Sequence, residues 1–153
     1  MTLDTMSVSL EPASWTPTFA CALARRFVAR CRFDDPAQVT CLLVTELVTN
    51  AVTHGGWGIT LEMRGSSSAV CSKVFDHGHA LPVMVPRRPL ADSGRGLHLV
   101  AALASDWGVE PVADGKVVWF DLRHPVESVS VAAFDAQCEA TGGEPARKPW
   151  VSG

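Results

Sequence analysis

The sequence predicts an α+β fold: a two-layer sandwich of a mostly antiparallel mixed sheet, with three helices on one face. The candidate segments follow the order strand, helix, helix, two strands, helix, two strands. Adjacent strand candidates are separated only by short turn segments, which is typical of antiparallel hairpins. Helices do not alternate with single strands, as they do in a doubly wound parallel sheet.

The first strand and the first helix are predicted from local patterns. Residues 7–10 (Ser-Val-Ser-Leu) alternate between polar and apolar, which indicates an edge strand. Thr16-Pro17 predicts a helix start, with Thr as the N-cap and Pro in the first helical position. The expected apolar stripe of this helix has a spacing of four residues and consists of Phe19, Leu23, Phe27 and Cys31.

The second helix has a stronger start signal. Asp35 is a favourable N-cap, Pro36 presets the backbone, and Gln38 stands where a capping box places Glu or Gln. We expect this helix to run to His54 and to end at Gly55-Gly56, because glycine adopts a left-handed conformation at little cost.

Two hairpins and a third helix complete the predicted domain. Residues 57–63 and 69–75 are strand candidates joined by a turn at 65–68, and 109–113 pairs with 117–122 across Asp114-Gly115. The third helix follows Gly94 and ends at Gly108. Its predicted apolar face consists of Leu97, Val100, Leu103, Ala104 and Trp107.

Length and composition restrict the class of protein. A chain of 153 residues corresponds to one domain, and a net charge of −3 excludes a strongly basic nucleic-acid binder. No apolar run reaches the ~20 residues of a membrane span, and no secretory signal is visible. We therefore place the domain at residues 1–123. The remainder, 124–153, carries Gly142-Gly143, Pro145 and Pro149 and is expected to be a partly disordered tail.

The five cysteines are an odd number and form no CxxC pair. This pattern argues against a disulfide scaffold or a zinc ribbon, and it favours a reducing cytoplasm. We expect all five to be small buried hydrophobic residues.

The second predicted helix carries an unusual polar stripe. Glu46, Asn50 and His54 are spaced four residues apart and so share one face. An Asn oxygen is a suitable ligand for Mg²⁺ beside substrate phosphates, and a Glu one turn away can accept a proton during phosphoryl transfer. A solvated polar face is an equally good interpretation of this helix taken alone.

Two further clusters follow. Asp76-His77-Gly78 comes directly after a strand, where a carboxylate can accept a hydrogen bond from an exocyclic amine and Gly lets a flat base approach. Taken alone, it is more simply an Asx-type turn. The segment 93–97 (Ser-Gly-Arg-Gly-Leu) opens the third helix, whose free N–H groups suit phosphate oxygens. A glycine N-cap is an equally good interpretation of this segment. The sequence has neither a GxGxxG motif after a strand nor a P-loop motif, so the usual dinucleotide-binding and P-loop interpretations do not apply.

Taken in order, the three clusters resemble the ATP-binding boxes of the Bergerat-fold (GHKL) ATPases, the group of gyrase, chaperone, histidine-kinase and mismatch-repair ATPases. The likeness runs from about Val8 to Leu122, and residues 115–120 (Gly-Lys-Val-Val-Trp-Phe) resemble the last strand of the group. Within it, the chain is most similar to the anti-sigma-factor serine kinases, and among these to short actinobacterial ATP-binding regulators.

This resemblance implies ATP or ADP and Mg²⁺ as ligands. It makes Glu46 the general base, Asn50 the metal ligand and Asp76 the acceptor for the adenine amine. Gly78 would lie beneath the ring and residues 79–93 would form a lid. The implied nucleotide-binding set is Asn50, His54, Asp76, Gly78, Ala80, Gly94, Arg95, Gly96, Leu97 and Val117.

The resemblance also implies a function. It predicts a cytoplasmic serine/threonine protein kinase that binds a sigma factor, phosphorylates an anti-anti-sigma antagonist and forms homodimers, with no direct contact to nucleic acid or membrane. Ala80 stands where a second Gly is usual, and Val117 stands where a Thr hydroxyl often assists adenine binding. One lost hydrogen bond costs about 0.5–1.5 kcal/mol, or roughly a tenfold loss of affinity.

Three alternatives remain at this stage. These two departures favour a nucleotide-gated module that sequesters a partner protein without significant kinase activity. A histidine-kinase fragment is less favoured, because only about 35 residues precede the Asp35 helix, and a gyrase-type role is not favoured because no second domain follows.

Overall fold

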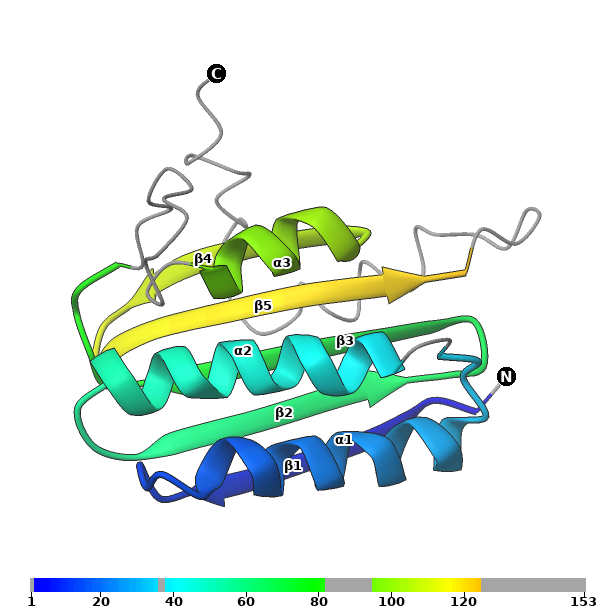
Figure 1. The fold of residues 1–153 in the computed structure, drawn as a ribbon, viewed down its shortest axis with the longest axis horizontal. Coiled ribbons are helices and arrows are strands. Elements are labelled where there is room, and N and C mark those ends of the chain that lie inside the picture. Colours follow the sequence, from blue (N-terminus) through cyan, green and yellow to red (C-terminus); the bar gives the residue numbers. More distant parts are fainter. Residues whose placement is uncertain (1, 36–37, 82–94, 125–153) are drawn as a thin grey trace.

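The computed structural model describes residues 2–35, 38–81 and 95–124 (Figure 1). Its five strands form one sheet in the order β1-β2-β3-β5-β4, and all four pairings are antiparallel. The strands are β1 (Asp4–Leu10), β2 (Ile59–Gly65), β3 (Ala69–Asp76), β4 (Asp106–Val112) and β5 (Gly115–Arg123). The helices are α1 (Thr16–Cys31), α2 (Val39–His54) and α3 (Arg95–Leu103).

All three helices cover the same face of the sheet, and α2 lies between α1 and α3 (Figure 1). The core lies between the two layers, because alternate residues of each strand point towards the helices. It includes Leu61, Val74 and Phe120 from the sheet and Val44, Val48 and Val100 from the helices. The predicted two-layer α+β sandwich is therefore confirmed. No parallel pair occurs among the described strands, so the expected mixed component is not observed.

The edge position of β1 and both hairpins are confirmed, since β1 pairs only with β2 and the turns lie between the predicted strands. The start of α2 is later than predicted. Helix α2 begins at Val39 rather than at Pro36, and Gln38 takes a left-handed conformation with no side-chain cap. Asp35 still caps the helix, because both its carboxylate oxygens lie within 3.1–3.2 Å of the Thr40 N–H.

The predicted third helix was too long. Helix α3 ends at Leu103, and Trp107 and Gly108 belong to β4. Trp107 is buried at 1 % exposure and alternates with Val109 on the inner face of the sheet. Trp107 happens to continue the helical spacing of the apolar residues in α3, which is why the helix was predicted to include it. Its side chain reaches the core from the sheet and not from the helix.

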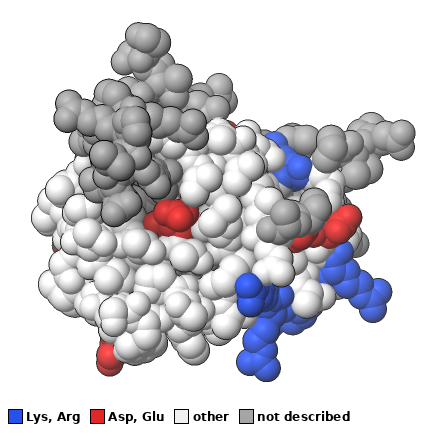
Figure 2. Space-filling model, viewed as in Figure 1, with Lys and Arg blue, Asp and Glu red and all other residues white. Residues whose placement is uncertain are grey.

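The predicted apolar stripe of α1 is correct only in part. Phe27 and Cys31 are buried and Leu23 is half-buried, but Phe19 is 45 % exposed and packs edge-on against Trp15. Ala20 and Ala24 take the buried positions, because small residues allow α1 to lie close to its neighbours. Figure 2 shows several basic side chains gathered at one end of this face. The exposed arginines in the second half of α1 and at its C-cap are Arg25, Arg26, Arg30 and Arg32.

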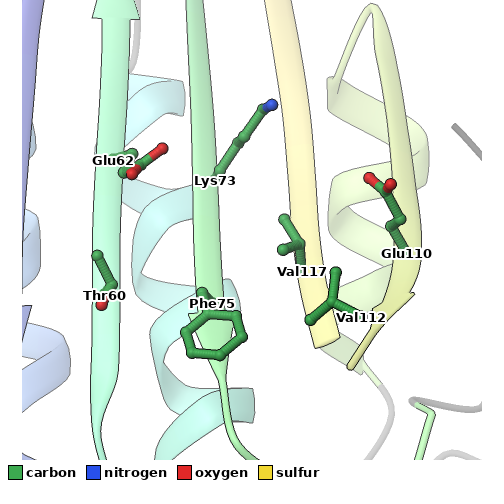
Figure 3. A pocket seen from close by; sticks show the side chains of 7 residues that line it. All are labelled: Thr60, Glu62, Lys73, Phe75, Glu110, Val112 and Val117. Atoms are coloured by element: carbon green, nitrogen blue, oxygen red, sulfur yellow. The ribbon is translucent and has the colours of Figure 1, made fainter. Parts of the chain in front are cut away.

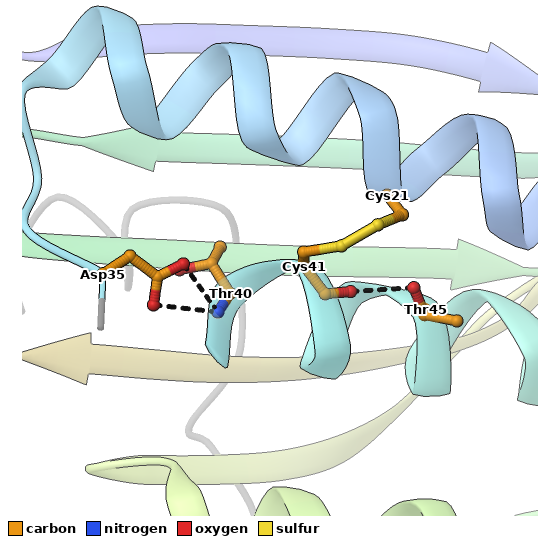
Figure 4. The surroundings of a disulfide bond; sticks show 5 residues. All are labelled: Cys21, Asp35, Thr40, Cys41 and Thr45. Carbon is orange, nitrogen blue, oxygen red and sulfur yellow. Dashed lines mark hydrogen bonds between the residues drawn. A yellow bond between two sulfur atoms is a disulfide. The ribbon is translucent and has the colours of Figure 1, made fainter. Parts of the chain in front are cut away.

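The expectation that all cysteines are reduced was wrong. Cys21 of α1 and Cys41 of α2 form a disulfide with a Cα–Cα distance of 4.7 Å (Figure 4). Cys31 and Cys71 are buried thiols, and burial, assisted by nearby Asp4, raises the pKa of Cys31 to about 11. Cys138 lies outside the described residues. Because disulfides are rare in a reducing cytoplasm, the cysteines no longer support the predicted cytoplasmic location.

We expect the Cys21–Cys41 bridge to stabilise the domain. The bridge closes a loop of 20 residues, which by loop-closure entropy is worth about 3 kcal/mol. Reduction by dithiothreitol should therefore lower the urea midpoint of the native protein. The Cys21→Ser variant should start at the lower value and should not respond to the reductant, and an equal response of both proteins would contradict the assignment.

The tail predicted at 124–153 lies outside the described residues except for His124. The His124 backbone N–H donates to Ser68 O, and its ring stacks on Phe33 at a centroid distance of 4.5 Å. The described part of the chain therefore extends one residue past the predicted boundary. None of the described helices is long and apolar enough to cross a membrane.

Candidate nucleotide-binding site

The polar stripe of α2 faces away from α1. The disulfide fixes Cys41 on the side of α2 that contacts α1. Asn50 follows nine residues later, which is about two and a half helical turns, so it points to the opposite side. Helix α3 covers the sheet on that side of α2 (Figure 1). Glu46 and Asn50 are both half-buried, whereas His54 at the end of the helix is exposed. The two inner members of the stripe are therefore partly enclosed.

Glu46 is the only acidic residue of α2. Partial burial withdraws water from its carboxylate, and this raises the pKa of Glu46 above the ordinary value for a glutamate. The hydroxyl of the adjacent Thr45 donates back to the Cys41 carbonyl at 2.8 Å, so its proton is not directed at Glu46. A glutamate with a raised pKa is a stronger base than an ordinary one once it is deprotonated.

The Asp76-His77-Gly78 segment forms a closed turn around a buried carboxylate. Asp76 is 1 % exposed, and its Oδ1 accepts a hydrogen bond from the Gly78 N–H at 2.8 Å. The Lys116 ammonium donates to the same Oδ1 at 2.8 Å and to the Gly78 carbonyl at 3.3 Å. Lys116 is itself 0 % exposed. The turn is thus held by a fully buried ion pair between β3 and β5.

Three glycines bring the surrounding segments into contact. A Cβ atom on Gly55 would lie 2.7 Å from Cβ and Cγ of Asp76, and one on Gly78 would lie 2.9 Å from Cα of Gly55. A Cβ on Gly115 would overlap the Asp76 carbonyl. The end of α2, the 76–78 turn and the start of β5 can therefore meet only because these positions have no side chain.

The first turn of α3 lies at the same end of the sheet (Figure 1). Arg95 and Gly96 begin this helix, so their N–H groups belong to its positive end. Gly94 lies outside the described residues, as do residues 82–93 of the predicted lid. Leu97 is buried at 6 % exposure within the hydrophobic core. The structure thus brings the end of α2, the 76–78 turn and the start of α3 to one end of the molecule.

Val117 does not belong to this group. It follows Lys116 in β5, so it points to the opposite face of the sheet, away from the helices. There it lines a hollow of about 230 Å³, which Figure 3 shows together with Phe75, Lys73 and Glu110. Ala80 is described and exposed, two residues after Gly78. The residue of β5 that faces Asp76 is Lys116 and not Val117.

Sequence reasoning missed two features of the site. The first is Lys116, which shares the inner face of β5 with Val118, Phe120 and Leu122. A lysine at a position where the strand alternation calls for an apolar residue is the signal in the sequence that could have revealed it. The second feature is an aromatic stack beside the turn. The exposed Trp57 ring lies 3.8 Å from the ring of His77, and His77 Nδ1 lies 3.1 Å from the Asp114 carbonyl oxygen. No local pattern predicted this stack.

The donor set suits a nucleotide-borne Mg²⁺ better than a dedicated metal cage. Among the described residues, no group of three or more His, Cys, Asp or Glu is placed to hold a metal ion. Asn50 offers one neutral oxygen, and Mg²⁺ typically combines one or two protein ligands with phosphate oxygens and water. Asn50 therefore fits as a single protein ligand, with the phosphates supplying others.

A family model described as histidine kinase-like ATPase domain matches residues 10–122. The chain belongs to this histidine kinase-like ATPase family. The match covers α1 to β4 and all of β5 except its last residue, and an ATPase domain implies nucleotide binding. The predicted GHKL family is thereby confirmed. A comparison with curated proteins gives no match.

Among solved structures, this ATPase domain is similar to the crystal structure of the RsbU and RsbW domains of Rv1364c from Mycobacterium tuberculosis. The TM-score is 0.60 at 19 % sequence identity, and the alignment covers 83 % of this chain. At this identity the likeness supports the fold alone. The present chain spans about a third, 34 %, of the chain in that crystal structure.

Proposed function

We propose that the protein binds Mg-ATP and acts as an anti-sigma-factor-type serine/threonine protein kinase, regulating a sigma factor through an anti-anti-sigma antagonist. The observation that carries this proposal is the convergence of four features at one end of an ATPase-family domain. They are the half-buried Glu46–Asn50 stripe, the buried Asp76 carboxylate, the glycine-lined 76–78 turn and the start of α3. The choice of pathway rests on the resemblance of the three sequence clusters, Glu46–His54, Asp76–Gly78 and Gly94–Leu97, to the anti-sigma-factor serine kinases.

Each residue has a defined role in this proposal. Asp76 accepts a hydrogen bond from the adenine amine, and the absence of a side chain at Gly78 leaves room for the ring. The N–H groups at the start of α3 receive phosphate oxygens. Asn50 supplies one ligand to Mg²⁺, which neutralises charge on the phosphates when bound.

In the transfer step, a serine or threonine hydroxyl of the antagonist attacks the γ-phosphorus. A new O–P bond forms, the bond between the γ-phosphorus and the β–γ bridging oxygen breaks, and ADP leaves. Glu46 accepts the hydroxyl proton. Its raised pKa suits this role, because the deprotonated form takes up a proton readily.

The alternative of a sequestering module without significant kinase activity rests on Ala80 and Val117. The position of Val117 weakens it, since this side chain lies on the other face of the sheet from Asp76. A missing hydroxyl at Val117 therefore does not remove a hydrogen bond beside Asp76. Retention of both Glu46 and Asn50 favours the kinase. Sigma-factor and antagonist partners, a homodimer and a cytoplasmic location remain part of the proposal.

Calorimetric titration with ATP tests the nucleotide site directly. We expect the native protein to bind ATP more tightly with Mg²⁺ than without it. The Asn50→Ala variant should lose most of this Mg²⁺ dependence, because its single protein ligand to the metal is absent. Thr49→Ala is the matched control, an exposed neighbour on α2 that should retain native behaviour. Absence of ATP binding by the native protein would refute the proposed function.

A further inference from the structure

Lys116 is an unusual residue for the interior of a sheet. Lysine is almost never fully buried unless it is paired, yet Lys116 is 0 % exposed. The register of β3 and β5 places it directly opposite Asp76, with the ammonium 2.8 Å from Oδ1 and 3.3 Å from the Gly78 carbonyl. Because the ammonium is fully enclosed, it can influence a bound ligand only through Asp76 and the turn.

The ion pair changes what Asp76 can offer to a ligand. Oδ1 already accepts two hydrogen bonds, one from Lys116 and one from the Gly78 N–H. Within residues 2–35, 38–81 and 95–124, no hydrogen bond is made to Oδ2. The carboxylate therefore presents one oxygen, not two, to an incoming base.

We propose that Lys116 is a positioning residue that makes Asp76 a one-oxygen acceptor and so selects adenine over guanine. This inference rests on the proposed function, in which the base amine binds Asp76. Adenine presents a single donor group, its C6 amine, and one oxygen satisfies it. Guanine presents N1–H and the C2 amine side by side, a pair that matches a carboxylate with both oxygens free.

With Oδ1 occupied, the C2 amine of guanine would find no acceptor at Asp76. A buried donor without a partner costs free energy, so guanine is disfavoured while adenine loses nothing. Lys116 also holds the carboxylate and the Gly78 carbonyl in place before the base arrives. Loss of Lys116 should therefore weaken ATP binding and, separately, relax the discrimination against the guanine amine.

The native protein provides the first test, through displacement of bound ATP by inosine triphosphate and guanosine triphosphate in the presence of Mg²⁺. These two nucleotides differ only in the C2 amine. We expect guanosine triphosphate to bind no more than about twofold more tightly than inosine triphosphate. A preference of tenfold or more would show that a second carboxylate oxygen is available, and it would overturn the inference.

The second test uses Lys116→Met, an unbranched side chain of similar length without the ammonium. We expect ATP affinity to fall at least tenfold and the guanosine-to-inosine affinity ratio to rise at least fivefold. Lys73→Met is the matched control. Lys73 belongs to β3 but lines the hollow on the outer face, so both quantities should stay native.

The outcomes separate the two claims. A native protein that binds none of the three nucleotides refutes the proposed function itself. A native protein that binds ATP, together with a folded Lys116→Met variant of unchanged ATP affinity and unchanged ratio, refutes the role of Lys116 alone. If thermal melting shows that Lys116→Met does not fold, the comparison of the two nucleotides on the native protein still decides the inference.

Discussion

Replacement of Glu46 by Gln is expected to reduce phosphate transfer to the antagonist by about 10²–10⁴-fold while leaving ATP affinity within about twofold of native. The substitution preserves the shape of a half-buried side chain and removes only its ability to accept a proton. Helix α2 has no other acidic residue that can replace it. Transfer of labelled phosphate from ATP to the antagonist measures the first quantity, and calorimetry measures the second.

The pH dependence of transfer gives an independent check on the same residue. Burial raises the pKa of Glu46, and only its deprotonated form accepts a proton. The native rate should therefore increase as the pH rises through this elevated pKa and then become constant. The Glu46→Gln variant should lack this increase. Glu62→Gln, on the outer face of β2, is the matched control and should follow the native profile. A native transfer rate in Glu46→Gln would rule out Glu46 as the base.

Local signals were sufficient for most elements of the fold. Turn-forming residues at 65–68 and at Asp114-Gly115 delimited both hairpins, and Gly55 marked the end of α2. These features depend on the conformational preferences of a few adjacent residues, so one sequence reveals them. The error at Trp107 had a different origin. Its spacing from Leu103 fits a helix, whereas its position in β4 depends on pairing with Phe120 of β5.

The same distinction applies to the site. The Glu46–Asn50 spacing and the Asp76-His77-Gly78 cluster are local patterns, so the sequence alone indicates them as candidate residues. The partner of Asp76 is 40 residues away in the sequence, and only the β3–β5 register makes the contact. The Cys21–Cys41 bridge likewise depends on how α1 packs against α2. Val117 was taken from the resemblance, as the position where a Thr hydroxyl often assists adenine binding, whereas the β3–β5 register places Lys116 opposite Asp76.

Asp76→Ala should be the most destabilising single substitution among those considered, costing about 3–5 kcal/mol of unfolding free energy. The change leaves the Lys116 ammonium buried without its carboxylate, and the Gly78 N–H loses its acceptor. Removal of both charges in Asp76→Ala/Lys116→Met should recover most of this loss. A buried pair that is replaced by apolar groups no longer carries the desolvation cost of its ions. Urea midpoints at 25 °C, compared with that of the native protein, measure the stability of both variants.

A surface ion pair of the same protein provides the control. Arg30 Nε lies 3.5 Å from Asp4 Oδ1, but the two side chains are 54 % and 35 % exposed, so solvent screens the interaction. Asp4→Ala should cost no more than about 1 kcal/mol. If Asp76→Ala is as mild as Asp4→Ala, or if the double variant is no more stable than Asp76→Ala alone, the buried pair does not fix the turn. In that case the selectivity inferred for Lys116 also loses its structural basis, because both depend on the same contact between β3 and β5.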